Sequence, residues 1–129
     1  CAFVDRRSAH RLRGEIDALS SLIKRGLHVV VFPEATSTRG DRILPFKGAL
    51  FEAVRRAEAP LWVARVDYGS AHLRAVSYAG DDLFGRHLLG LLSLGSVSGI
   101  VSWVYRETEV ASHSARELAQ LARERILTA

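Results

Sequence analysis

Residues 28–48 read HVVVFPEATSTRGDRILPFKG, and this stretch decides the fold expected for the chain. Its first part, His28–Phe32, is a continuous apolar run of strand length, the pattern of a strand covered on both faces. Pro33 ends the strand because proline has no N–H for pairing. A polar loop of fourteen residues, 33–46, then leads to a helix that starts near Gly48. Loops this long inside a compact domain are usually functional, so we expect a site here.

The segments on either side of this stretch continue the alternation of strand and helix. Before it, we expect a strand at residues 2–5 and a helix that Ser8 caps and that runs to about residue 25, with an apolar stripe at Leu12, Ile16, Leu19 and Ile23. After it, we expect a helix over 48–57, strands over 61–66 and 73–78, a helix with 83–92 capped by Asp82, and a strand over 100–105. A last helix should start at Ser112 or Ser114, with its inward side chains at Leu118, Leu121, Ala122 and Ile126.

This order of elements predicts an α/β fold with a largely parallel sheet flanked by helices. The chain opens at Cys1, without methionine and directly in strand-like sequence. We therefore expect residues 1–129 to form a single partial domain that is truncated at its N-terminus. Residues 88–105 carry no charge, but seven of these eighteen are Gly or Ser. They predict a short helix, a turn and a strand rather than a membrane span, which needs about 20 predominantly apolar residues.

Charge and cysteine content narrow the class of protein. Residues 1–56 hold eleven Lys and Arg against six Asp and Glu, a net charge of +5, whereas residues 57–129 hold seven against eight. A basic first half favours anionic partners such as phosphate esters or acidic membranes, although it is also compatible with an ordinary basic surface. With Cys1 as its one cysteine, the chain has no internal disulfide, which fits a reducing compartment.

The loop after Phe32 has the composition of an anion site. It carries hydroxyls, guanidinium groups and an ammonium, which are the groups that bind a phosphate monoester. It also lies between the carboxyl end of a strand and the start of a helix, where α/β proteins bind anionic ligands. The same composition is compatible with a solvated turn. Glu34 would repel a phosphate, so we expect it to accept backbone N–H bonds, to orient an arginine, or to bind a substrate hydroxyl.

The sequence motifs of this loop resemble those of a known family. FPEAT at residues 32–36, followed by Arg39-Gly40 and by LPFKG at 44–48, is similar to the third block of the 1-acylglycerol-3-phosphate acyltransferase family, F-P-E-G-T-R-S and then L-P-F-K. FVDR at 3–6 is similar to the end of the second block, G-x-x-F-x-x-R. Residues 59–63 stand where the fourth, apolar block would be, and residues 78–87 look like some bacterial members.

The resemblance implies an enzyme that moves a fatty acyl group from acyl-CoA or acyl carrier protein to a hydroxyl of a lysophospholipid or glycerol phosphate. It implies no cofactor and no metal, and a place on the cytoplasmic face of the membrane, either peripheral or anchored by a segment outside this chain. By the same resemblance, Arg6 contacts the phosphate, Glu34, Ala35 and Thr36 shape the acceptor site, and Arg39 and Lys47 add positive charge. Taken without the family, Arg6 is more simply a surface arginine.

The chain departs from the family pattern at two positions and lacks one block. Ala35 replaces the usual glycine, at a cost on the order of 1 kcal/mol if the backbone needs a positive φ, and Ser37 stands where arginine is common. The first block, N-H-x-x-x-x-D, is absent, because no histidine has Asp five residues later. His10 and Glu15 have the nearest spacing but the wrong block order. We therefore expect the catalytic His-Asp pair upstream, with Glu34 in support and the fragment alone inactive.

Other readings stay open at this point. The first alternative is a non-catalytic module that binds anionic lipid head groups through the basic loop. A phosphate-ester hydrolase or nucleotide-binding domain is less favoured, because neither G-x-x-x-x-G-K-[ST] nor G-x-G-x-x-G is present. Nucleic acid is not an expected partner, because few aromatic residues are interleaved with the basic ones.

Overall fold

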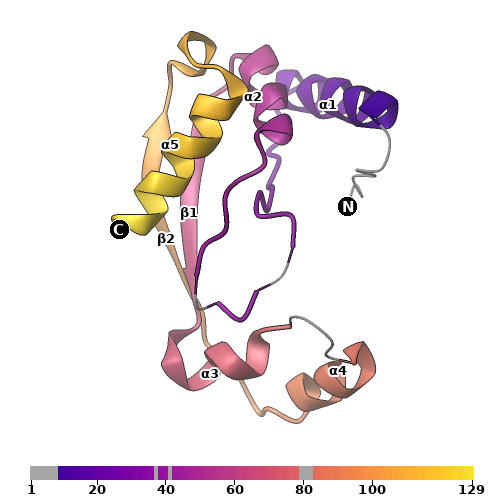
Figure 1. The fold of residues 1–129 in the computed structure, drawn as a ribbon, viewed down its shortest axis with the longest axis vertical. Helices are drawn as coiled ribbons and strands as arrows, with labels where there is room; N and C mark the ends of the chain where they lie inside the picture. The colour runs from indigo at the N-terminus through magenta and orange to yellow at the C-terminus, as the bar shows by residue number, and fades with distance from the viewer. Residues whose placement is uncertain (1–8, 37, 41, 79–82) are drawn as a thin grey trace.

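A computed structural model describes residues 9–36, 38–40, 42–78 and 83–129 (Figure 1). The elements are α1 (Ala9–Lys24), η1 (Gly48–Leu50), α2 (Phe51–Ala57), β1 (Leu61–Asp67), α3 (Gly69–Val76), α4 (Phe84–Leu92), β2 (Ile100–Glu107), η2 (Val110–Ser112) and α5 (Ala115–Leu127). The structure thus mixes helices and strands, as the α/β prediction requires. The strand predicted at residues 2–5 and the caps predicted at Ser8 and Asp82 lie outside the described residues.

The two strands of the described chain form one antiparallel ribbon. β1 pairs with β2 from Leu61 opposite Glu107 to Asp67 opposite Ile100, with an irregularity between Val63 and Ala64. The strands are joined by the long α3–α4 excursion, so the pairing is not a tight hairpin. Within the described residues this ribbon is antiparallel, and a largely parallel sheet is not seen.

Two predicted strands are wrong. Residues 28–32 have no strand structure, and the side chains of Val30 and Phe32 are each 79% exposed. No strand among the described residues lies beside this run to pair with its N–H and C=O groups, and apolar content alone cannot make a strand.

Of the segment predicted as a strand over 73–78, residues 73–76 instead form the second half of α3. Gly69, at a φ of +65°, turns the chain out of β1, and its N–H donates to the Asp67 carboxylate at 2.7 Å. The residues that follow include alanine, leucine and arginine, which favour helix. A short apolar run cannot be assigned to strand or helix from periodicity alone.

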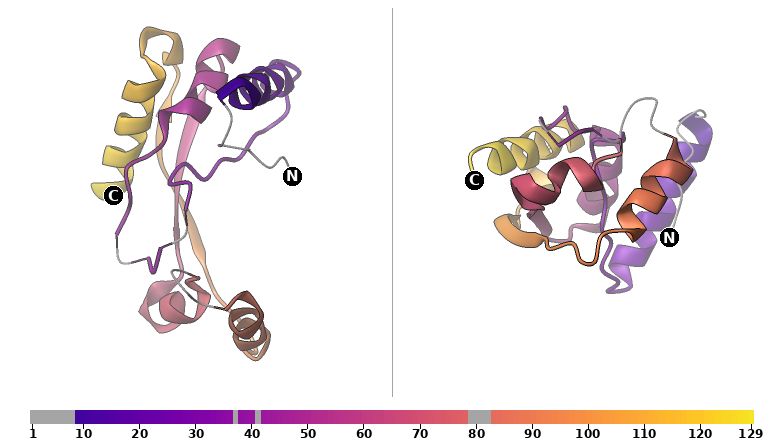
Figure 2. Two further views of the ribbon diagram at one scale, coloured as in Figure 1. Left: turned by 45° about the vertical axis from the view of Figure 1, so that its right-hand side comes forward. Right: turned by 90° about the horizontal axis from the view of Figure 1, so that it is seen from below.

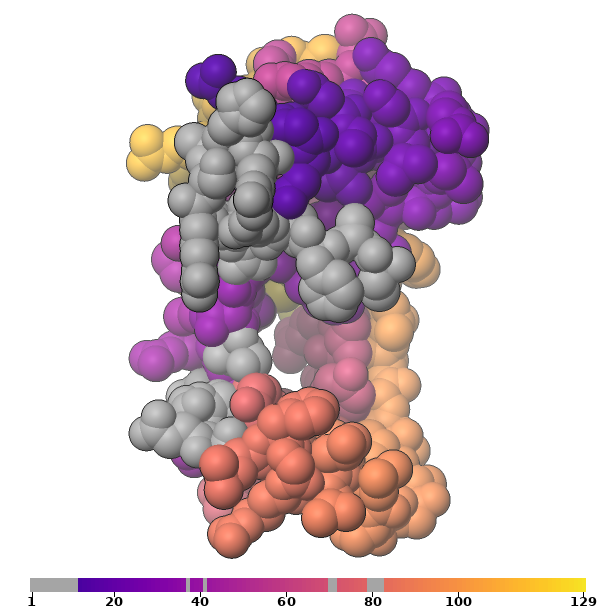
Figure 3. Space-filling model, turned by 90° about the vertical axis from the view of Figure 1, so that its right-hand side faces the viewer, coloured from indigo at the N-terminus to yellow at the C-terminus, as the bar shows by residue number. Residues whose placement is uncertain are grey.

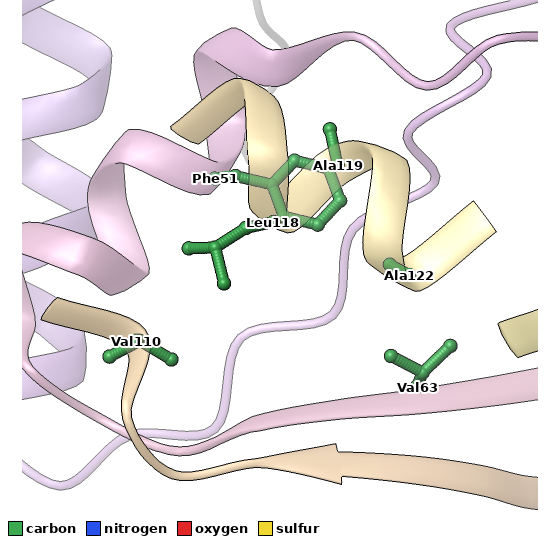
Figure 4. Close-up of a cluster of buried hydrophobic side chains, with 6 residues drawn as sticks. All are labelled: Phe51, Val63, Val110, Leu118, Ala119 and Ala122. Atoms are coloured by element: carbon green, nitrogen blue, oxygen red, sulfur yellow. The ribbon is translucent and has the colours of Figure 1, made fainter. Parts of the chain in front are cut away.

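The core lies where α5 packs across α2 and the adjoining part of the ribbon. Figure 4 shows its buried side chains, which are Phe51, Val63, Val110, Leu118, Ala119 and Ala122. α5 begins with a capping box, because the Ser114 hydroxyl accepts from the Glu117 N–H at 3.2 Å while the Glu117 carboxylate accepts from the Ser114 N–H at 2.7 Å. Of the two starts predicted for the last helix, Ser112 or Ser114, the structure has Ser114 as the N-cap.

A second, smaller core joins α1 to α2. Ile16 and Leu19 of α1 are buried against Ala53, with Leu12 and Ile23 packed beside them. These α1 residues are the apolar stripe predicted from helical spacing. An ionic link adds to this contact, because Arg56 of α2 bonds both Glu52 and Asp17 of α1.

The opposite end of the ribbon carries α3 and α4, well separated from α1, α2 and α5 (Figures 1 and 2). The accessible surface of the whole chain is 9548 Å², whereas a compact monomer of 14.2 kDa is expected to expose only about 6,800 Å². The residues predicted as helix, turn and strand between 88 and 105 are confirmed, since α4 ends at Leu92 and β2 begins at Ile100. None of the helices in the described part of the chain has the length and apolar character needed to cross a bilayer.

Candidate functional site

The loop predicted as the site is a long irregular segment closed at its base. It leaves the end of α1, passes beside the ribbon toward α3, and returns to η1 (Figure 1). The Lys47 N–H donates to the Pro33 carbonyl at 2.9 Å, so the two ends of the loop meet. Such closure fixes the loop as a compact unit rather than a trailing connection.

Glu34 holds the loop together from inside. Its half-buried carboxylate accepts the N–H of Leu44, ten residues later, at 2.9 Å. Of the three roles considered for this carboxylate, the structure shows the first, acceptance of a backbone N–H. A carboxylate used in this way braces the loop, and one of its oxygens is engaged with the protein itself.

Ala35 has a φ of +68°, in the left-handed region. An L-residue with a β-carbon pays on the order of 1 kcal/mol for this conformation, and glycine avoids that strain. The structure therefore supplies the physical reason why a glycine would suit this position. The strained alanine shows that the closed loop, rather than local preference, sets the backbone here.

The tip of the loop docks against α3. Gly40, with a φ of +74°, lies so close to Leu73 that a β-carbon there would fall 2.5 Å from the leucine Cδ1 atom. On the other side of the contact, the Ser77 hydroxyl lies within hydrogen-bonding distance of the Leu73 carbonyl of its own helix and, at 3.0 Å, of the Arg39 carbonyl. Gly40 is thus needed for both its conformation and its close approach, and Arg39 is placed at the junction of the loop and α3.

Arg123 of α5 is a loop-holding residue that the sequence analysis missed. Its guanidinium donates to the carbonyls of Leu44, at 3.1 Å, and Ile43, at 2.9 Å, about eighty positions away in the chain. Leu44 therefore has both backbone polar groups bound by distant charged side chains, Glu34 at the N–H and Arg123 at the carbonyl. The sequence contains no signal for this role, since Arg123 reads as one more basic residue on an amphipathic helix.

The predicted ligand-binding side chains stand on this braced frame. Thr36, Arg39 and Lys47 are exposed, and the structure records no side-chain hydrogen bond or ion pair between them and other described residues. Arg39 is at the loop tip and Lys47 at its base, so these two cations are not brought into contact. Arg6 lies outside the described residues, as does Ser37.

Among the histidine side chains that the structure describes, the recorded approach to a carboxylate is not a catalytic pair. His113 Nε2 comes to 3.7 Å from Glu107 Oε2, but that carboxylate is already bound by the Tyr105 hydroxyl and the Glu109 N–H, both at 2.7 Å. These hydrogen bonds lower the pKa of Glu107. The Glu107 carboxylate therefore has a structural role. In the part of the chain that the structure describes, no three His, Cys, Asp or Glu side chains gather as a metal site would require.

Comparison with known proteins shows what the chain is similar to. The family model described as Acyltransferase matches residues 1–67, about half of the chain. The lyso-ornithine lipid O-acyltransferase of Brucella abortus (strain 2308) is 31% identical to the chain over 110 residues, which is 74% of this chain and 41% of that protein. The lyso-ornithine lipid O-acyltransferase of Rhizobium meliloti (strain 1021) is 28% identical over 110 residues, which is 74% of this chain and 38% of that protein. A Caenorhabditis elegans protein named as a 1-acyl-sn-glycerol-3-phosphate acyltransferase, acl-2, is 33% identical over 82 residues, 62% of this chain and 29% of its own length.

The chain thus spans well under half the length of these curated relatives. No solved structure gives a significant match to it.

Proposed function

Because the chain belongs to the acyltransferase family, we propose that the protein transfers a fatty acyl group from an acyl thioester to a hydroxyl of a lysophospholipid or glycerol phosphate. The observation that carries this proposal is the braced loop at residues 33–47. It lies inside the matched segment, Glu34 and Arg123 hold its backbone, and its cations Arg39 and Lys47 stay exposed. This arrangement suits an acceptor with an anionic head group.

The proposed reaction is a direct displacement. The acceptor oxygen attacks the thioester carbonyl carbon, the new C–O bond forms, and the C–S bond breaks to release the thiol of coenzyme A or acyl carrier protein. The hydroxyl proton goes to a histidine base, which we place in an N-H-x-x-x-x-D block upstream of Arg6, with the aspartate orienting the imidazole. No covalent acyl-enzyme and no cofactor are needed.

The residues of this chain position the acceptor in the proposed complex. Arg6 and Lys47 neutralise the anionic head group, and Arg39 adds charge from the loop tip. Thr36 offers a hydroxyl as donor or acceptor. Glu34 acts through the loop, because its bond to Leu44 sets where Ala35 and Thr36 lie.

A second acceptor class is favoured by a specific observation. Two of the relatives are named for lyso-ornithine lipid, and this chain has Ala35 and Ser37 in place of the family's glycine and arginine. An ornithine head group offers a carboxylate to the same cations that would bind a phosphate. We therefore propose lyso-ornithine lipid as the second candidate acceptor.

The wider setting of the loop is also a proposal. We infer that residues 1–129 are part of a single domain whose sheet is larger than the β1–β2 ribbon and largely parallel. The exposed side chains of Val30 and Phe32 support this, because further elements of such a domain would cover them. We place the protein on the cytoplasmic face of the membrane, where its lipid acceptor is found.

Thiol release from acyl-CoA tests the activity. The protein with its natural upstream segment should release thiol only when 1-acylglycerol-3-phosphate or lyso-ornithine lipid is added, whereas the chain of 129 residues alone should not. Lys47→Ala should raise the acceptor KM about tenfold or more, and Arg116→Ala, an exposed arginine of α5, is the matched control. Folded protein that binds anionic vesicles but releases no thiol with either acceptor would instead support a lipid-binding module without catalysis.

A further inference from the structure

α4 exposes most of its apolar face. Phe84, Leu88 and Leu92 recur at four-residue spacing and therefore lie on one side of the helix. Leu89, on the same broad face, is 69% exposed and Leu92 is 72% exposed, and Arg86, three residues before Leu89, borders this face. Soluble monomers seldom leave a contiguous apolar patch uncovered unless it serves in binding.

Further exposed apolar side chains lie on the part of the ribbon beside α4. Figure 3 shows α4 in coral at the lower end of the molecule, with the orange segment that leads into β2 beside it. The exposed side chains of this second segment are Val97, Ile100, Val101 and Trp103. No charged residue interrupts the sequence from Leu88 to Tyr105, but on the ribbon Asp67 and Arg65 of β1 lie opposite Ile100 and Ser102. The uninterrupted apolar surface is therefore that of α4 itself.

Charge and size indicate which partner fits this surface. Residues 69–99 contain two arginines and two aspartates, so their formal charge is zero and they offer no complement to a charged protein. A helix of nine residues is only about 13 Å long, too short to supply the roughly 800 Å² per partner of a stable protein interface. An amphipathic helix in a membrane interface needs only to insert its apolar face about 5–10 Å deep.

The position of the loop tip supports a lipid partner, and this step rests on the proposed function. Gly40 packs on Leu73 of α3, and Ser77 binds the Arg39 carbonyl, so the loop tip and the α3–α4 unit are held together. If α4 lies among acyl chains, Arg39 lies near the level of the lipid head groups. An acceptor lipid could then present its head group to the loop without leaving the bilayer.

We propose that α4 docks the protein on a bilayer by inserting Phe84, Leu88, Leu89 and Leu92 between the lipid acyl chains. The docking is driven by apolar contact. It therefore takes place on uncharged membranes and resists salt, unlike adsorption through the basic first half of the chain.

Vesicle flotation of the full chain tests this surface. The probes are vesicles of phosphatidylcholine alone and of phosphatidylcholine with phosphatidylglycerol, each at low and high salt. The double variant Leu89→Gln/Leu92→Gln keeps good helix formers in place and should reduce partitioning at least about tenfold. Leu127→Gln, at an exposed leucine at the end of α5, is the matched control and should bind as the wild type does.

The outcomes separate docking from catalysis. Equal flotation of the double variant and the wild type, or wild-type binding that needs phosphatidylglycerol and disappears in salt, would overturn the proposal. So would a wild-type dimer that the double variant converts to monomer in light scattering, because the face would then join two copies. Acyl transfer to a short-chain, monomeric acceptor should be unchanged in the double variant of the protein with its upstream segment. Failure of that assay in the wild type would count against the proposed function and not against docking.

Discussion

The apolar faces of two amphipathic helices, α5 and α4, are buried at one end of the ribbon and exposed at the other. α5 buries Leu118 completely, under α2 and the ribbon, whereas α4 leaves Leu89 and Leu92 largely in solvent. α4 is the more apolar of the two, since it has four leucines and a phenylalanine in nine residues. An apolar stripe therefore does not by itself make a core. It does so only where a second element covers it, and the described chain supplies that cover at one end only.

The largest expected effect contrasts two leucines across these ends. Leu118→Ala should lower the free energy of unfolding by about 3 kcal/mol, because it removes buried methyl groups and leaves a cavity. Leu89→Ala should change it by less than about 0.5 kcal/mol, since that side chain is already exposed. Urea unfolding of both variants makes the measurement. Similar losses for the two would mean that the α4 face is covered in solution.

The next largest effect is expected at Arg123, which links α5 to the loop at residues 33–47. Arg123→Ala removes two hydrogen bonds to the carbonyls of Ile43 and Leu44 and should cost about 1–2 kcal/mol of stability. It should also raise the acceptor KM in the protein with its upstream segment, because the loop loses a brace. Arg123→Lys keeps the charge but not the two-pronged donor, so it should recover only part of either effect. An unchanged KM beside reduced stability would limit Arg123 to a structural role.

A smaller effect is expected from the ionic contacts of α2. The hydrogen bonds from Arg55 and Arg56 lower the pKa of Glu52 to about 2. Because the folded pKa is below the ordinary value of 4.5, this stabilisation is present above about pH 4.5 and is lost as the pH falls toward 2. The shift alone would correspond to about 3 kcal/mol, but the arginines are 38% and 43% exposed, so screening reduces it to about 1 kcal/mol.

Stability curves against pH check this expectation. Glu52→Gln should remove that part of the acid dependence while leaving the rest of the curve in place. A variant whose loss of stability between pH 4.5 and 2 equals that of the wild type would show that Glu52 does not contribute.

The smallest effect is at the strained alanine of the loop. Ala35→Gly relieves a φ of +68° but adds freedom to the unfolded chain, so we expect a net gain of about 0.5 kcal/mol. Ala75→Gly, within α3, should instead lose up to about 1 kcal/mol, because that position is helical. Thermal unfolding of the two variants, measured side by side, shows whether each substitution raises or lowers the stability. A loss at position 35 as large as at position 75 would mean that the loop does not hold its left-handed turn.

Much of the architecture was predictable because it depends on nearby residues. The stripe of α1, the bounds of α2 and β1, the helix and strand between 88 and 105, and the cap at Ser114 all follow from spacing and local hydrogen bonds. The predictions that failed, strands at 28–32 and 73–78, needed a partner that sequence spacing does not show. For the candidate site, the loop and its cations were proposed from the sequence and their binding role stays a prediction, whereas the contact from Arg123 had no signal in the sequence.

The sequence by itself determined the length and charge of the loop at 33–46, the residue types offered to a ligand, and the family motif they form. Only the tertiary structure decided that β1 and β2 pair antiparallel across a long excursion, that Glu34 binds Leu44, and that Arg123 reaches the same residue from α5. The physical reason is the sequence distance over which each interaction acts. Turn, cap and helix preferences act over a few residues, whereas strand pairing and side-chain reach depend on which distant backbone groups packing brings within hydrogen-bonding distance.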